Sequence, residues 1–418
     1  MALRDMEPRK ILLIVGFVLA VFILGYLLYS LFFSSAKEAV IEPGQRDQQQ
    51  TGQLNPSDEQ LKLPDEDENT GGGLPQSQPQ QQNQIVSKTA SGGLTYVSTL
   101  VDFSNNGATL AANGTDLLYY NGLDSRFYKI SPDGKVNAIV DTRFFEADNI
   151  AFNQARNKAV IEYPDSANVT YNFGSGEQVT LPAHWQEFQF SQQGETLAFK
   201  NIGLNPENNW LALSAATGTQ ARFIQNLGNN SNRVDINWSP NNQVVATFID
   251  AESDQVSGEQ HELIFLGKNN ENFKSVLVEG YGYEGQWSKT GDRLLYSVHN
   301  GNSDFKPQVW IVNAQGNAAG SGRRNLKLET WAHKCGFGEN NVAYCAVPRE
   351  MREGIGFAPE LASGVADNFY RIDLNTGVKT QIAQPDGNYT AQKVFVSEDG
   401  KFLYFRDQNS GNIHKIEL

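Results

Sequence analysis

A pattern of three apolar positions recurs seven times between residues 110 and 405 and constrains the fold more than any other feature of this chain. Each copy has an apolar residue p, then a polar turn, then apolar or small residues at p+7 and p+9. The copies begin at Leu110, Phe152, Phe190, Trp238, Trp287, Cys335 and Val396. Two alternating strands joined by a tight turn give this spacing, so each copy is predicted to be a β-hairpin.

A second hairpin follows each copy and completes a repeat of 38 to 61 residues. The clearest example is Tyr370–Leu374, followed by the turn Asn375-Thr376-Gly377 and the segment Val378–Ile382. Glycine supplies the positive φ that such turns need. Repeats of this length predict an all-β fold, a seven-bladed β-propeller with four-stranded blades. Six blades would require merging one weak repeat, for which the second is the best candidate because Ala159 replaces a large residue.

The last repeat holds three strands instead of four, because only Ile413–Ile416 follows Phe405 before the chain ends at Leu418. A strand-like segment, Leu94–Val101, lies upstream of the first blade. Natural sheets avoid exposed edges that could pair with other chains. We therefore expect this N-terminal strand to close the last blade.

Three of the hairpins share the order apolar, Ser, x, x, Gly, with an apolar and an aromatic residue further on. These hairpins are Phe190–Phe199, Trp287–Tyr296 and Val396–Phe405. They resemble TolB-type, WD-like propeller repeats, and the resemblance covers about residues 93–418. It implies a propeller that is usually extracytoplasmic and often a platform for protein binding, although the group includes propellers fused to peptidases. Blades two and six depart from the pattern, with Ala155-Arg156-Asn157 and Gly336–Glu339 in place of the Ser-x-x-Gly turn.

The N-terminal part of the chain predicts a membrane anchor. Residues 11–33 carry no charge and are long enough, at about 1.5 Å per residue, to cross a bilayer core of about 30 Å. Arg4, Arg9 and Lys10 precede this segment, so the positive-inside rule predicts residues 1–10 in the cytoplasm. A cleavable signal peptide is the alternative, but its apolar region is usually shorter. The expected protein is a single-pass membrane protein with an extracellular or periplasmic propeller.

Residues 34–92 are rich in Gln, Gly and Pro and contain no aromatic residue. Such a segment cannot bury enough apolar surface to offset its chain entropy, so it is predicted to be a disordered tether. The expected organisation is therefore a cytoplasmic N-terminus at 1–10, a transmembrane helix at 11–33, the tether at 34–92 and the propeller at 93–418.

Charge and motifs argue against several functions. The net charge is −14, and residues 91–418 alone carry −10, which argues against binding to nucleic acid. No Gly-x-Ser-x-Gly elbow occurs, so a fused serine peptidase is excluded. The five histidines show no metal-ligand spacing, and no cofactor, metal site or catalytic constellation is predicted. A calcium site on the acidic loop 250–254 and axial carboxylates brought together by the fold remain open.

Cys335 and Cys345 are the only cysteines and lie on the two arms of one predicted hairpin. Outside the cytoplasm two such thiols would usually oxidise. We therefore expect a disulfide in blade six, with two buried free thiols as the alternative.

Long loops join the second and third strands of several blades, above all residues 346–368. In a propeller these loops share one face with the connections between blades. Apolar residues on this face form the candidate binding surface: Trp185, Tyr281, Tyr283, Phe305, Trp331, Met351, Ile355, Phe357 and Tyr389. Packing between blades is an equal alternative for Trp185 and Trp331. An insertion as long as 346–368 is commonly functional.

The sequence thus predicts a membrane-anchored, extracytoplasmic propeller that serves as a protein-binding scaffold in the cell envelope and is not an enzyme. Its partner would be an envelope protein or a surface polymer. The alternative is a propeller that binds or cleaves glycans, as a lectin, hydrolase or lyase. Carboxylates converging on the axis would favour the enzyme, and an apolar rim would favour the scaffold.

Overall fold

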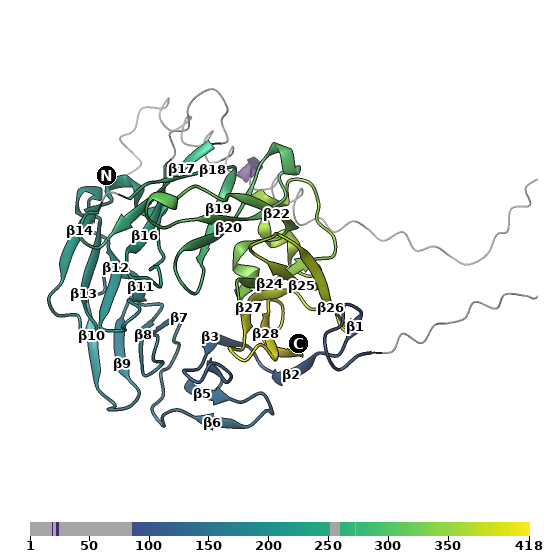
Figure 1. The fold of residues 1–418 in the computed structure, drawn as a ribbon. Helices are drawn as coiled ribbons and strands as arrows, with labels where there is room; N and C mark the ends of the chain where they lie inside the picture. The colour runs from purple at the N-terminus through teal and green to yellow at the C-terminus, as the bar shows by residue number, and fades with distance from the viewer. Residues whose placement is uncertain (1–18, 20–21, 25–85, 251–259, 272) are drawn as a thin grey trace, which may run out of the picture. The chain divides into compact units, whose positions relative to one another are not determined.

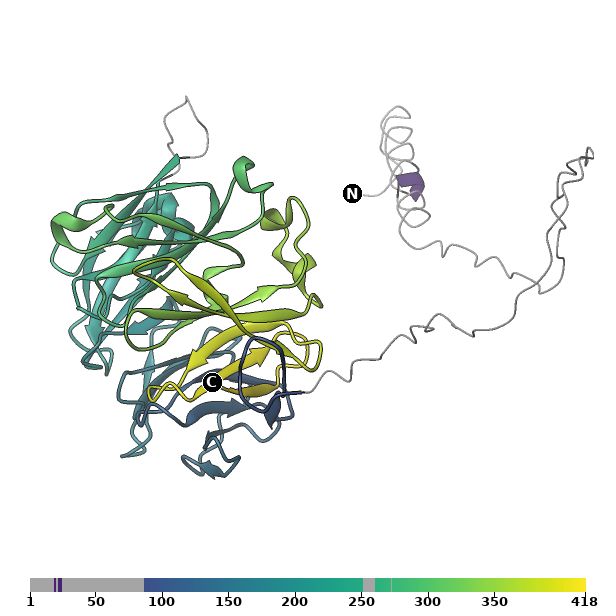
Figure 2. The same cartoon turned by 45° about the vertical axis from the view of Figure 1, so that its right-hand side comes forward.

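Seven antiparallel sheets follow one another along the chain and surround a common axis (Figures 1 and 2). The computed structural model describes residues 19, 22–24, 86–250, 260–271 and 273–418. Blade one contains β3 (Asn105–Leu110), β4 (Leu117–Asn121), β5 (Arg126–Ile130) and β6 (Val136–Ala138). Blade two contains β7 (Asn149–Phe152), β8 (Lys158–Glu162), β9 (Asn168–Asn172) and β10 (Gln178–Leu181). Blade three contains β11 (Trp185–Phe190), β12 (Thr196–Asn201), β13 (Trp210–Ala215) and β14 (Arg222–Asn226).

The remaining blades repeat this order. Blade four contains β15 (Val234–Ile236), β16 (Val244–Ile249), β17 (Gln260–Gly267) and β18 (Val276–Glu279). Blade five contains β19 (Tyr281–Trp287), β20 (Arg293–His299), β21 (Gln308–Asn313) and β22 (Arg324–Glu329). Blade six contains β23 (Cys335–Phe337), β24 (Val342–Pro348), β25 (Asp367–Asp373) and β26 (Lys379–Pro385). Blade seven contains β27 (Ala391–Val396), β28 (Phe402–Asp407), β29 (Ile413–Glu417) and the N-terminal β2 (Ser98–Val101).

The predicted seven-bladed propeller is confirmed, and so is its closure by an N-terminal strand. β2 pairs antiparallel with β29 and supplies the outermost strand of blade seven. The single strand expected at 94–101 is wrong, because its first two residues form β1 (Leu94–Thr95), which pairs parallel with β26 of blade six. The chain crosses between the blades at Val97, whose backbone N–H donates to Oδ1 of Asp386 at 3.1 Å. One short segment therefore fastens two neighbouring blades.

The repeat register is confirmed in most blades and wrong in blade six. Position p lies opposite p+7 in five of the blades, for example Phe190 opposite Leu197. In blade six Cys335 lies opposite Cys345, and Phe337 lies opposite Ala343. The turn there is one residue shorter, since the N–H of Gly338 donates to the carbonyl of Val342. Phe337, and not Cys335, therefore holds the p position.

The core lies between the blades, because each sheet is covered on both faces by its neighbours. The second strand of a blade therefore has buried side chains on both faces, as in β12, where five of six residues are buried. One cluster joins Leu263 and Phe265 of blade four to Leu294 and Tyr296 of blade five. All four side chains are at most 3% exposed. Burial of this kind contributes about 1.5–3 kcal/mol for each large side chain.

The N-terminal predictions lie largely outside the described residues. Within the described part of the chain, no helix has the length and apolar character needed to cross a bilayer. Segments 1–10 and 34–85 are not described, and 11–33 is described only at residues 19 and 22–24. Residues 86–92, assigned to the tether by sequence, lie against the propeller: the N–H of Ala90 donates to the carbonyl of Glu417 at 2.7 Å.

Candidate functional site

One end of the propeller carries the long connections and the starts of the inner strands; we call it the loop face. Antiparallel pairing places the loops after β12, β20 and β24 at this end. These loops contain short 3-10 helices: η2 (Pro206–Asn208), η4 (Gly301–Ser303), η7 (Ile355–Phe357) and η8 (Pro359–Ala362). Others on the loop face are η3 (Gly228–Arg233) and η6 (Ala332–Lys334), while η5 (Gly316–Ala318) lies between β21 and β22 at the opposite end.

The blade-six insertion, residues 349–366, is folded down onto blade five. The N–H of Gly354 donates to the carbonyl of Asp304 at 2.8 Å, and the N–H of Gly356 to that of Phe305 at 2.9 Å. Ile355 and Ala362 pack against the indole of Trp331, all three being buried. The insertion therefore has a small core of its own.

Four aromatic rings gather where the insertion meets blade five; we call this group, Tyr281, His299, Phe305 and Phe357, the aromatic cap. The ring of Phe357 lies 4.6 Å from His299, 5.1 Å from Phe305 and 6.2 Å from Tyr281. Phe357 is 62% exposed and Tyr281 38% exposed, while His299 is buried beneath them. Burial lowers the pKa of His299 below its usual value, which favours the neutral ring.

The nine residues predicted for the binding surface divide by burial. Tyr281 and Phe357 are exposed, and four others are half-buried: Tyr283, Phe305, Met351 and Tyr389. Trp185 and Trp331 are buried, which favours the alternative of packing for both, and the expectation of exposure is wrong for Ile355, which is buried as well. The reason is packing beneath the loops: Trp185 stacks on Phe199 with ring centroids 3.8 Å apart, and Trp331 holds the insertion.

An axial cavity of about 1260 Å³ lies below the loop face. The inner strands of all seven blades line it, and Trp331, Pro359 and Glu360 lie at its edge. The lining combines amides with aromatic rings. The amides are Asn106, Asn149, Gln189, Gln286, Gln392 and Gln408, and the rings include Phe152, Phe188, Phe337 and Phe395. Such a lining can donate and accept hydrogen bonds while also offering apolar faces.

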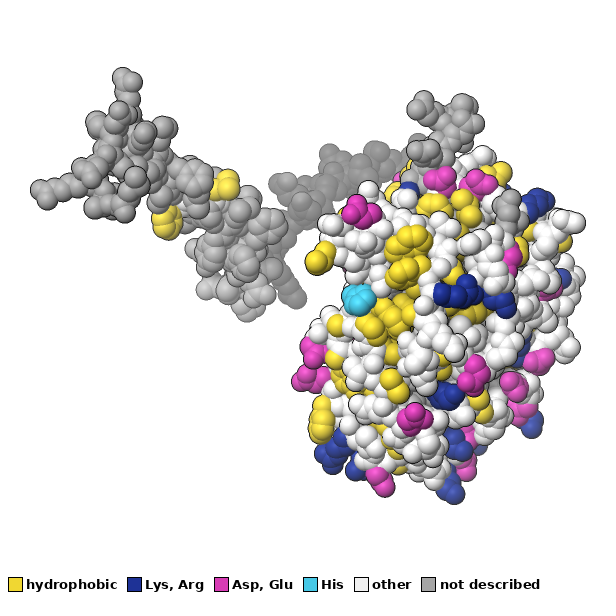
Figure 3. Space-filling view, turned by 90° about the vertical axis from the view of Figure 1, so that its left-hand side faces the viewer, with side chains coloured by type: hydrophobic (Ala, Val, Ile, Leu, Met, Phe, Trp, Pro, Cys, Tyr) yellow, Lys and Arg dark blue, Asp and Glu magenta, His cyan; other side chains and the backbone are white. Residues whose placement is uncertain are grey.

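Five basic side chains line this cavity, among them Arg156, Lys393 and Arg406, together with two carboxylates, Asp148 and Glu360. Reduced hydration lowers the pKa of Arg156, Lys393 and Arg406, and the charge of Arg156 lowers that of Lys393 further. On the side of the propeller that Figure 3 shows, acidic and basic side chains are intermixed. Basic side chains therefore outnumber acidic ones in the cavity lining, whereas the two signs are intermixed on this outer surface.

Carboxylates come from the inner strands of three successive blades: Glu187 of β11, Asp235 of β15 and Glu284 of β19. Reduced hydration, followed by the charge of Glu187, raises the pKa of Asp235 to about 6, and the charge of Glu284 adds to this. Lys200 opposes the shift, with its Nζ 2.5 Å from Glu187. Nδ1 of His333 lies 2.7 Å from Oε2 of Glu284. Asp235 can therefore exchange a proton near neutral pH. Among the described residues, no three His, Cys, Asp or Glu side chains are grouped so that they could hold a metal ion.

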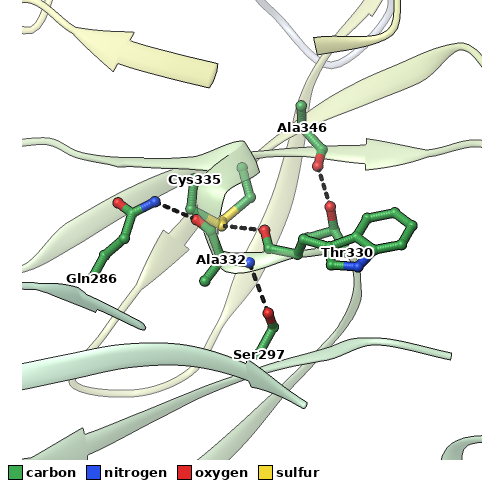
Figure 4. The surroundings of a disulfide bond; sticks show 8 residues. Gln286, Ser297, Thr330, Ala332, Cys335 and Ala346 are labelled. Atoms are coloured by element: carbon green, nitrogen blue, oxygen red, sulfur yellow. Dashed lines mark hydrogen bonds between the residues drawn. A yellow bond between two sulfur atoms is a disulfide. The ribbon is translucent and has the colours of Figure 1, made fainter. Parts of the chain in front are cut away.

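Cys335 and Cys345 form a disulfide across β23 and β24, with Cα atoms 4.0 Å apart (Figure 4). The segment just before it is fixed by two hydrogen bonds to side chains of blade five. The N–H of Ala332 donates to Oγ of Ser297 at 3.0 Å, and Nε2 of Gln286 donates to the Ala332 carbonyl at 2.6 Å (Figure 4). These contacts position Trp331 and His333 at the edge of the cavity.

Sequence reasoning missed the basic residues of the cavity. One signal was available for Arg156, because it lies in the blade-two turn that departs from the Ser-x-x-Gly pattern. Its guanidinium donates from Nε to the carbonyl of Leu110 at 2.8 Å, which directs it toward the axis. Lys393 and Arg406 lie in strands that look ordinary in sequence.

Comparison with known proteins supports the fold. No protein-family model matches the chain, and no curated protein matches its sequence. The structure is similar to an oligogalacturonate lyase in complex with manganese, with a TM-score of 0.50, 12% identity, and coverage of 77% of this chain and 93% of that one. It is also similar to the β-propeller domain of Cps50 (Swd1) from Myceliophteria thermophila, with a TM-score of 0.52, 8% identity, and coverage of 77% and 99%. At these identities the similarity shows the β-propeller fold alone.

Proposed function

We propose that this protein is a membrane-anchored, extracytoplasmic scaffold that binds an envelope protein through its loop face. The observation that carries the proposal is the exposed position of Phe357 on an insertion anchored to blade five. A large ring held in place by neighbouring rings loses little entropy on binding and buries a large area. The disulfide supports an oxidising compartment, and the uncharged segment 11–33 supports the anchor.

The test is site-specific photocrosslinking in intact envelopes. The photoreactive residue p-benzoylphenylalanine is placed at position 357 in one variant and at position 378 in the other. Val378 is the matched control, because it is also 62% exposed but lies in the turn at the opposite end of β25. The proposal expects one defined protein adduct from position 357 and none from 378. Equal adducts from both positions, or none from 357, would contradict docking on the loop face.

A second candidate function is glycan binding in the axial cavity. The cavity volume and its mixture of amides and aromatic rings favour it, since sugars present hydroxyls at their edges and C–H groups on their faces. The similar structure of an oligogalacturonate lyase adds support. Retention of the purified protein on a glycan array, lost when Gln392 and Asn149 are both changed to Ala, is the expected result. An array with no retained glycan would remove this candidate.

A further inference from the structure

Two like charges face each other inside the axial cavity. Lys393 of β27 lies directly opposite Arg406 of β28 in the antiparallel pairing. Like charges at directly opposite positions destabilise a sheet. Arg156, from the neighbouring wall of the same cavity, adds a third cation whose field reaches Lys393.

None of these three cations forms an ion pair within the described part of the chain. The two guanidinium groups donate to neutral acceptors: Arg156 to the carbonyls of Leu110 and Asn153 at 2.8 and 2.9 Å, and Arg406 to the carbonyl of Asn105 at 2.8 Å and to Gln392. Nζ of Lys393 lies 5.3 Å from the ring centre of Phe395. The carboxylate nearest to Arg406 in sequence, Asp407, accepts instead from Thr390 and Ser410.

Other cations lining the same cavity do have carboxylate partners. Lys334 lies 2.8 Å from Asp367, and Lys289 lies 2.5 Å from Glu339. The chain has 14 more acidic than basic residues, so carboxylates are not scarce. Like charges held close together without an ion pair are unfavourable in the empty protein. A bound anion would remove this cost.

We propose that the axial cavity binds an anionic ligand, whose carboxylate or phosphate oxygens accept hydrogen bonds from Arg156, Lys393 and Arg406. The inference extends the second candidate function and does not depend on the loop face. The cavity is far larger than one inorganic ion, and Asn106, Gln392 and Gln408 lie along its wall beside the cations. The ligand class that fits is therefore an oligomeric anion with hydroxyl groups, either a uronate oligosaccharide or a polyol phosphate.

Isothermal titration calorimetry of the purified full-length protein tests the inference with three probes: a galacturonate oligomer, a glycerol phosphate oligomer and a neutral galactose oligomer. We expect one anionic oligomer to bind, with affinity falling steeply as salt rises, because the contacts are ionic. Lys393→Gln and Arg406→Gln should each weaken binding about tenfold or more. Lys289→Gln is the matched control, a cavity cation that already has a partner, and should change affinity less than about threefold.

A thermal melt without ligand separates a binding role from a structural one. Removing an uncompensated cation should leave the melting temperature of Lys393→Gln equal to or above that of the unchanged protein. A lower melting temperature would mean that Lys393 supports the fold, and it would overturn the inference.

Three outcomes of the calorimetry decide between the proposals. Binding of neither anion overturns the inference. Binding of the galactose oligomer that Lys393→Gln leaves intact also overturns it, while supporting glycan binding. Binding of the phosphate oligomer alone, lost in Lys393→Gln, supports the inference and removes the glycan candidate.

Discussion

Nζ of Lys334 lies 2.8 Å from Oδ1 of Asp367, and both side chains are almost completely enclosed, at 3% and 0% exposure. The second oxygen of Asp367 accepts the N–H of Ala391 at 2.6 Å. The pair thus joins η6 and β25 of blade six to the first residue of β27 in blade seven. An ion pair this well satisfied fixes the geometry of both blades at the edge of the cavity.

Removing either partner of this ion pair should destabilise the folded protein. Asp367→Asn or Lys334→Met leaves one charge buried without a partner, and we expect each to lower the free energy of unfolding by about 3–5 kcal/mol. Chemical denaturation followed by tryptophan fluorescence measures the change. The double variant Lys334→Met/Asp367→Leu should recover much of the loss, because no charge stays buried. A double variant as unstable as the sum of the singles would show that the pair is needed for more than charge balance.

The disulfide should stabilise blade six because it lowers the conformational entropy of the unfolded chain. It closes a loop with a sequence separation of 10 residues, for which chain entropy gives about 2–3 kcal/mol. Adding reductant should lower the unfolding midpoint of the unchanged protein and leave that of Cys335→Ser/Cys345→Ser unaffected. Identical midpoints with and without reductant, once thiol titration shows full reduction, would contradict the prediction.

The folded position of the insertion, residues 349–366, should depend on the side chain of Ile355 and not on that of Phe357. Ile355 is 3% exposed against Trp331, so Ile355→Ala should cost about 2–4 kcal/mol locally and release residues 349–366. Limited proteolysis should then cut this segment at least tenfold faster. Phe357→Ala, which removes a ring that is 62% exposed, should change the cutting rate much less. Similar rates in the two variants would mean that the aromatic cap, rather than Trp331, holds the insertion.

Asp235 should make stability depend on pH. Its pKa is about 6 in the fold, against a usual value of 3.8, so the folded state holds the proton more tightly than the unfolded state. The contribution of protonated Asp235 to the free energy of unfolding is therefore complete below about pH 4 and is lost as the pH rises through 6. Asp235→Asn should be more stable than the unchanged protein at pH 8, by at most about 1 kcal/mol because solvent screens the site, and equal to it below pH 4. A difference that is the same at both pH values would contradict this assignment.

Much of the fold could be predicted because the blades of a propeller repeat one sequence pattern. Seven copies of one hairpin pattern reveal the blades even where single copies are irregular. The register of blade six was the exception, since Cys335 is apolar and fell into the pattern while the true position, Phe337, lies two residues later. A shorter turn changes spacing without changing composition, and a fixed-spacing template cannot detect it.

The site could be predicted far less well. Exposure of a residue such as Trp331 depends on whether a distant loop folds over it, and here Ile355 does so from 24 positions away in sequence. The basic group of the cavity has no local signature, because Arg156 comes from blade two and Lys393 from blade seven, which flank blade one only once the ring is closed. Such juxtapositions are properties of the closed ring.

Ring closure also sets an order of events during synthesis. β2 is made before the strands of blades one to six, and its partner β29 is made after them; Thr99 and His414, which contact each other at 3.1 Å, are 315 positions apart. Blade seven therefore cannot assemble until β29 has left the ribosome. Until then the edge of β2 has no partner within its own chain, and whatever shields it in that interval protects the nascent propeller from pairing with a neighbour.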